Sequence, residues 1–164
     1  MAGVAATGGY LLAALPNVEI MTAVLFTAGY AVGRSLGVLS AVVASLIYFG
    51  LNPQGGLFPP LLAAQILGMS AAPLAGASWH RWAPAGWPRH LLLGAIALTL
   101  TLWYDLLTNL AFPLAVGFDK KGILLTLAAG IPFSAIHIAS NALIFVFLVP
   151  PLLQLVQRGL AAER

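Results

Sequence analysis

Long apolar runs that carry almost no charge constrain this sequence more than any other feature. Of its 164 residues, 61% are hydrophobic and 7% are charged, whereas soluble domains carry about 25% charged residues. So little charge cannot cover a water-facing surface, which argues against a very apolar soluble bundle. We therefore predict an all-α integral membrane protein that forms a single domain over residues 1–164.

Turn and break signals divide the chain into six expected membrane-spanning helices. The predicted spans cover roughly residues 2–15, 19–32, 36–50, 59–78, 89–112 and 132–157. The first is short, because a helix needs about 20 residues to cross the hydrocarbon. The sequence Gly130-Ile131-Pro132 predicts a break, so residues 123–129 are expected to form a short re-entrant or lid-like helix. Pro150-Pro151 is expected to kink the last span near its end.

The positions of the basic residues predict the orientation of these spans. With six spans, one set of loops holds Arg34, Arg81, Arg89, Arg158 and Arg164, and the other holds Lys120 and Lys121. The positive-inside rule places the richer set in the cytoplasm. We expect a multi-pass protein of the cell (cytoplasmic) membrane with both termini cytoplasmic. The basic residues are scattered instead of clustered, so no nucleic-acid partner is expected.

Two apolar runs carry polar side chains at helical spacing. Asp105 and Asn109 lie four residues apart, and His137 and Asn141 repeat that spacing. Residues four apart share one face of a helix. Ionisable groups within membrane segments are costly and normally face a cavity, a partner or the interior of a bundle. We predict that both pairs lie in the outer half of the membrane and handle a substrate there.

Glu19, Asp105 and His137 provide the ionisable groups for a metal or acid–base site, but no known catalytic pattern surrounds them. The sequence has no cysteine and neither a His-x-x-x-His nor an HExxH pattern, so we expect no metal and no cofactor. Ser134 and Ser140 lie near His137 in sequence without a nucleophile elbow. We therefore expect no catalytic residue and no enzyme.

The remaining polar and aromatic residues suit a binding pocket. Amides, hydroxyls and aromatic faces orient small polar or heterocyclic ligands, and Trp103, Tyr104 and Phe133 are candidates for stacking on a ring. The alternative for each Asn is a hydrogen bond that holds two helices together.

Several motifs resemble those of the substrate-binding S components of energy-coupling-factor (ECF) vitamin transporters. The resemblance covers nearly the whole chain. Its marks are PNVE followed by a threonine-containing helix (residues 16–22), a Gly-Arg-x-x-Gly turn (33–37), a Gly-rich loop before the helix with Gln65, WYDLLTN (103–109) and HIASN (137–141). The resemblance implies a six-helix membrane protein that captures a vitamin or related micronutrient from outside.

The resemblance also implies partners and site residues. A membrane coupling subunit and two ABC-type ATPases would supply the energy, with Ala2 and Ala6 at the coupling-subunit interface. The residues expected to bind substrate are Asn17, Glu19, Tyr104, Asp105, Asn109, His137 and Asn141, with Asn52 and Gln65 as further candidates.

Two other functions stay open on the sequence alone. One is a stand-alone carrier in which Asp105 and His137 relay protons. The other is a ligand-free membrane scaffold in which the polar pairs only lock helices together. Substrate identity is not specified by these residues.

Overall fold

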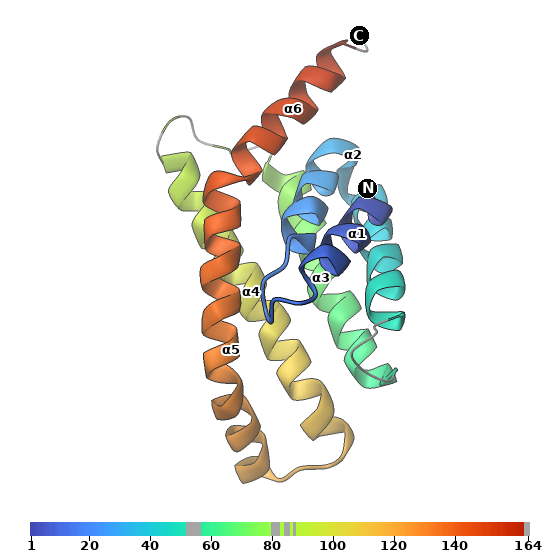
Figure 1. The fold of residues 1–164 in the computed structure, drawn as a ribbon, viewed down its shortest axis with the longest axis vertical. Coiled ribbons are helices and arrows are strands. Elements are labelled where there is room, and N and C mark those ends of the chain that lie inside the picture. Colours follow the sequence, from blue (N-terminus) through green and yellow to red (C-terminus); the bar gives the residue numbers. More distant parts are fainter. Residues whose placement is uncertain (52–56, 80–82, 84–85, 87, 163–164) are drawn as a thin grey trace.

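Six helices make up the fold of the computed structural model, which describes residues 1–51, 57–79, 83, 86 and 88–162 (Figure 1). The helices are α1 (Ala2–Leu12), α2 (Met21–Gly50), α3 (Pro59–Trp79), α4 (Pro88–Ala115), α5 (Lys120–Phe147) and α6 (Val149–Ala162). The described residues form no strand. The prediction of an all-helical protein is therefore confirmed.

Helix α2 folds back on itself at Gly33. This residue has φ 83° and ψ −178°, which is not helical and is readily adopted only by glycine. A Cβ built on Gly37 would lie 2.9 Å from the Cα of Gly29, so the two halves of α2 are in backbone contact. The predicted break between residues 32 and 36 is confirmed.

Helices α2 and α3 cross with almost no space between their backbones. A Cβ on Gly29 would lie 2.0 Å from the carbonyl oxygen of Pro73, and one on Gly76 would lie 1.9 Å from that of Phe26. Small residues allow this approach and increase van der Waals contact between helices in a membrane. The buried rings of Trp79 and Phe145 pack edge-on against Phe26 beside this crossing.

The predicted break at residues 130–132 is wrong, because α5 runs without interruption from Lys120 to Phe147. Residues 123–129 are its first turns and not a re-entrant helix. Gly130 instead marks a close approach of α4, since a Cβ there would lie 3.0 Å from the Asn109 amide nitrogen. Pro132 lies inside the helix, as membrane helices tolerate when neighbouring groups satisfy the freed carbonyl.

The predicted last span, residues 132–157, is likewise wrong. It combines the second half of α5 with the start of α6, and the two helices separate at Leu148. Pro150 and Pro151 lie in the first turn of α6, where a missing N–H costs nothing. The first turns of α6 pack in the core through Val149 and Leu153, and its C-terminal part projects beyond the other helices (Figure 1). Gln157 Nε2 donates to Tyr30 Oη of α2 (2.6 Å).

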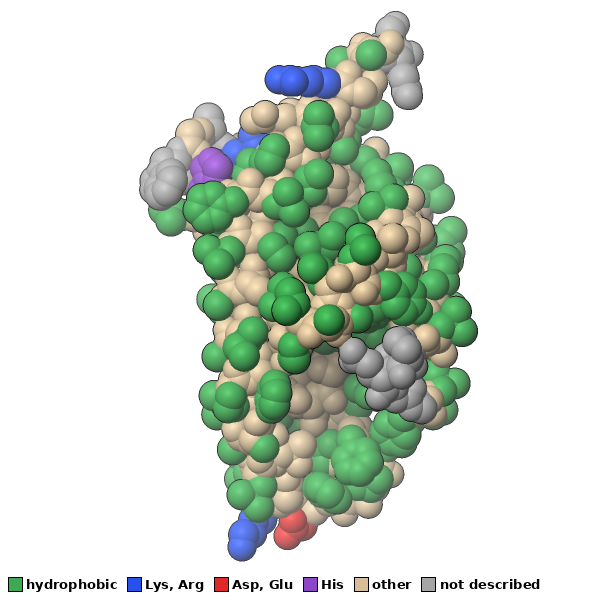
Figure 2. Space-filling model, viewed as in Figure 1, with side chains coloured by type: hydrophobic (Ala, Val, Ile, Leu, Met, Phe, Trp, Pro, Cys, Tyr) green, Lys and Arg blue, Asp and Glu red, His purple; other side chains and the backbone are tan. Residues whose placement is uncertain are grey.

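By length and composition four helices are apolar enough to cross a membrane: α3, α4, α5, and α2 when its two halves on either side of Gly33 are counted as one helix. With 28 residues, α4 extends over about 42 Å, more than the roughly 30 Å of a bilayer's hydrocarbon core. Helix α1 ends at Leu12, earlier than predicted, and its 11 residues extend over only about 17 Å. Hydrophobic side chains cover the middle of the face in Figure 2, whereas Lys and Arg appear near its two ends. These features indicate a membrane-embedded protein.

The α2–α3 crossing predicts a matched pair of glycine variants. Gly76→Ala places a methyl group against the backbone of Phe26 and should lower the free energy of unfolding by about 1–3 kcal/mol, the usual cost of overpacking. Gly159→Ala is the control, because nothing lies within 4 Å of its Cβ position on α6. Unfolding of the detergent-solubilised protein measures both. Equal stability of the two variants would contradict the tight crossing.

Candidate functional site

The loop between α1 and α2 carries Glu19 into the interior. Asn17 adopts φ 57°, a left-handed conformation that asparagine tolerates better than most residues. Ser140 on α5 donates through Oγ to the Asn17 carbonyl oxygen (3.1 Å). This hydrogen bond ties the loop to α5 and fixes the position from which Glu19 enters the helices.

Three donors hold the Glu19 carboxylate in place. The Thr22 backbone N–H donates to Oε2 (2.9 Å), and its hydroxyl donates to Oε1 (2.6 Å). Asn141 Nδ2 on α5 also donates to Oε1 (3.1 Å). Glu19 therefore fixes the start of α2 and links it to α5.

His137 lies between two carboxylates. Its Nδ1 donates to Asp105 Oδ1 (2.7 Å), and its Nε2 lies 3.6 Å from Glu19 Oε1. The ring of Tyr104 meets the imidazole edge-on, with centroids 5.7 Å apart. The polar faces that the sequence predicts on two separate helices thus meet in the structure.

Asn141 joins the same network from the next helical turn. Its Nδ2 donates to Thr101 Oγ1 on α4 (3.0 Å) as well as to Glu19, and both Asn141 and Thr101 are buried. Three buried atoms of the cluster have no hydrogen-bond partner among the described residues: Asp105 Oδ2, His137 Nε2 and Asn141 Oδ1. Buried polar groups are normally satisfied, so these atoms have unused capacity to bind a further polar group.

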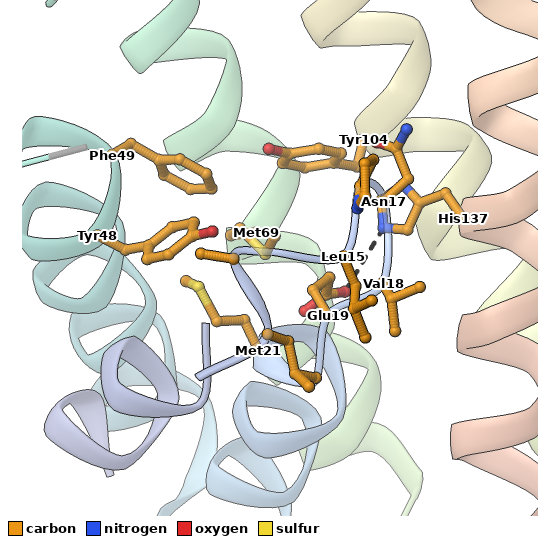
Figure 3. Close-up of a pocket in the computed structure, with 13 residues that line it drawn as sticks. Leu15, Asn17, Val18, Glu19, Met21, Tyr48, Phe49, Met69, Tyr104 and His137 are labelled. Carbon is orange, nitrogen blue, oxygen red and sulfur yellow. Dashed lines mark ion pairs between the residues drawn. The ribbon is translucent and has the colours of Figure 1, made fainter. Parts of the chain in front are cut away.

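A cavity of about 200 Å³ lies beside this cluster. Tyr48 and Phe49 from α2 line one side, and Glu19 and His137 line the side opposite (Figure 3). The complete lining consists of Leu12, Ala13, Leu15, Pro16, Asn17, Val18, Glu19, Met21, Tyr48, Phe49, Met69, Tyr104 and His137. We call this space the aromatic cavity.

A second cavity, of about 330 Å³, adjoins the aromatic cavity. Asn17 and Tyr104 line both cavities. We call the second one the amide cavity, since Gln65 and Asn109 contribute side-chain amides. Its other lining residues are Asp105, Thr108, Gly130, Phe133 and Ser134. Neither lining includes a Lys or Arg, so Glu19 and Asp105 make this region electronegative.

The predicted site residues divide between these two cavities. Glu19 and His137 line the aromatic cavity, Gln65, Asp105 and Asn109 line the amide cavity, and Asn17 and Tyr104 line both. Asn141 lies behind Glu19 as its hydrogen-bond donor. Asn52 lies outside the described residues.

Three further residues predicted from the sequence, Ala2, Ala6 and Trp103, line neither cavity. Ala6 is buried within the chain and Ala2 is partly buried against the core. Their contact with a coupling subunit stays a prediction. Trp103 is 45% exposed and lines neither cavity.

Sequence reasoning missed several residues of the site. Thr101 gave no signal because one threonine in an apolar run is ordinary, and Tyr48 and Phe49 looked like the apolar end of a span. The only sequence clue to their role was that they lie shortly before Asn52 and its turn. Thr22 appeared solely as part of the opening motif.

The described residues contain no group of three or more His, Cys, Asp or Glu side chains arranged to hold a metal ion. Comparison of the sequence and structure with protein-family models, with curated proteins and with solved structures gives no match. The function must therefore be argued from the site itself.

Two threonines of α4 test the polar cluster. Thr101→Val leaves one buried N–H of Asn141 without an acceptor, which should cost about 1–3 kcal/mol of unfolding free energy. Thr99→Val is the matched control, because Thr99 is exposed and bonds only to its own helix. Chemical unfolding in detergent measures the difference. Similar losses in both variants would mean that the Asn141–Thr101 bond contributes nothing.

Proposed function

We propose that this protein is the substrate-binding membrane subunit of an ECF-type ABC importer. In this proposal it captures a vitamin or related micronutrient from outside. It then delivers the substrate inward with a membrane coupling subunit and two ATPase subunits. The sequence has no Gly-rich phosphate-binding loop, so ATP hydrolysis is assigned to the partners. The motifs around residues 16–22, 103–109 and 137–141 are the basis of this family assignment.

The observation that supports binding most strongly is the polar cluster beside the aromatic cavity. Glu19, Asp105 and His137 come from three separate elements and converge within hydrogen-bonding or ion-pair distance. A cluster that only locked helices together would not require a cavity of about 200 Å³ beside it. A preformed concave site with a few convergent polar groups is the usual form of a small-molecule pocket.

In the proposed topology the chain crosses the cytoplasmic membrane six times with both termini inside. Helices α3, α4 and α5 supply three long passes, and α1 and the two halves of α2, each shorter than a full span, supply three short ones. The α4–α5 turn with Asp119, Lys120 and Lys121 then faces outward, and α6 extends on the cytoplasmic side. In Figure 1 the start of α1 and the last turns of α6 lie toward the end opposite that turn, which supports this topology.

A proton-coupled carrier is the second candidate, and one observation favours it. Asp105, His137 and Glu19 form a chain of ionisable groups that runs from the amide cavity to the aromatic cavity. Such chains serve as proton relays in pumps and transporters. The two candidates differ in whether the isolated protein can accumulate its substrate.

Ligand binding tests the proposal directly. A thermal-shift or native mass spectrometry screen against a vitamin panel should find a stabilising compound. His137→Phe keeps a planar ring but removes both ring nitrogens, and should weaken binding of that compound at least about tenfold, or about 1.4 kcal/mol. Asp119→Asn, in the exposed α4–α5 turn, should bind normally. Unchanged affinity in a folded His137→Phe variant would exclude the cluster from the site.

Transport by the isolated protein separates the two candidates. Proteoliposomes that contain only this protein should bind the compound but not accumulate it, with or without an imposed pH gradient. Accumulation that follows the pH gradient and ends when the gradient is dissipated would favour the carrier. The importer proposal requires accumulation to appear only with the coupling subunit, the ATPases and ATP.

A further inference from the structure

The charges at the aromatic cavity indicate which ligands it can accept. Glu19 lines the cavity and Asp105 lies directly behind His137. Two carboxyl groups and one imidazole make up this cluster, so acidic groups outnumber basic groups beside the cavity. The lining contains no Lys or Arg that could offset the charge. A carboxylate or phosphate on the ligand would therefore meet repulsion, whereas a cation would be attracted.

The unused hydrogen-bonding capacity of Glu19 also favours a ligand that donates N–H groups. An ionised carboxylate offers about four acceptor sites, and Glu19 receives two side-chain donors on Oε1 but only the Thr22 N–H on Oε2. Oε2 can accept another donor. His137 provides an independent sign of a ligand site, since it is only 4% exposed, lines the cavity and has no hydrogen-bond partner at Nε2 among the described residues.

The opposite wall favours a flat, positively charged group. Tyr48 and Phe49 pack edge-on with centroids 4.9 Å apart, and Tyr104 lies next to Phe49 with a centroid separation of 6.4 Å. Aromatic faces attract cations through their quadrupole and stack on planar rings. The sulfur-bearing side chains of Met21 and Met69 complete this side of the cavity, as Figure 3 shows.

We infer that the aromatic cavity binds a small, planar, nitrogen-rich cation that donates N–H groups to Glu19 and carries no carboxylate or phosphate. Amidinium and protonated aminopyrimidine groups are of this class. This inference rests on the proposed function and narrows its substrate. The volume of about 200 Å³ is below the range of about 300–1,000 Å³ for drug-sized ligands, so it accommodates one small ring system.

Three probes of one shape and different charge test the inference. Benzamidine, benzamide and benzoate share a ring and a planar substituent but carry positive, zero and negative charge. Saturation-transfer NMR or calorimetry on the full-length protein in nanodiscs should rank their affinities in that order. Benzamidine should bind at least about tenfold more tightly than benzoate, a difference of about 1.4 kcal/mol.

Glu19→Gln identifies the group responsible for the ranking. Glutamine keeps one of the two acceptor oxygens that Thr22 uses and removes the charge. Benzamidine affinity should therefore fall about tenfold, about 1.4 kcal/mol, while benzamide affinity changes little. Asp119→Asn removes one negative charge far from the cavity and retains a side-chain oxygen to cap α5. It should leave the ranking unchanged, which controls for the overall charge of the protein.

Each outcome decides the question. Benzoate binding as tightly as benzamidine, or a ranking that Glu19→Gln does not alter, would overturn the inference. If no probe binds but a vitamin-panel compound does, a cationic compound without acidic groups supports the inference. A neutral or anionic compound overturns it while the importer proposal stands. If nothing in either set binds, both proposals fail.

Discussion

The Glu19 carboxylate, whose side chain is only 16% exposed, makes the interactions on which the rest of the site depends. It receives donors from Thr22 at the start of α2 and from Asn141 on α5, and it faces His137 Nε2 at 3.6 Å. A buried charge is costly unless it is paired and hydrogen-bonded. The α1–α2 loop, α2 and α5 are therefore held in one arrangement, and Asp105 extends that arrangement to α4.

The sequence predicted part of the site because helical spacing can be read without tertiary information. Asp105 with Asn109, and His137 with Asn141, had to share helix faces, and the structure brings Asp105 and His137 together at 2.7 Å. Gly33 was predictable for a similar reason, since only glycine readily adopts its backbone conformation. In each case a local rule determines the outcome.

The wrong predictions concern residue types that can play two different structural roles. Gly130 looked like a helix break but instead gives room for Asn109 of α4, a role that only the neighbouring helix reveals. The interruption expected at Pro150-Pro151 does occur, but it lies at Leu148 and separates two helices, so Pro150 lies in the first turn of α6. Thr101 and Tyr48 carry no pattern signal within apolar runs, so their roles emerge only from the packing of α2, α4 and α5.

We expect the ligand to be held between Glu19 and His137 on one side and Tyr48 on the other. A structure of the protein with its tightest-binding compound measures this directly. The account predicts ligand density in the aromatic cavity, with a ligand N–H within about 3.2 Å of a Glu19 carboxylate oxygen. Ligand bound solely in the amide cavity, or on the outer surface of the helices with the aromatic cavity unchanged, would contradict it.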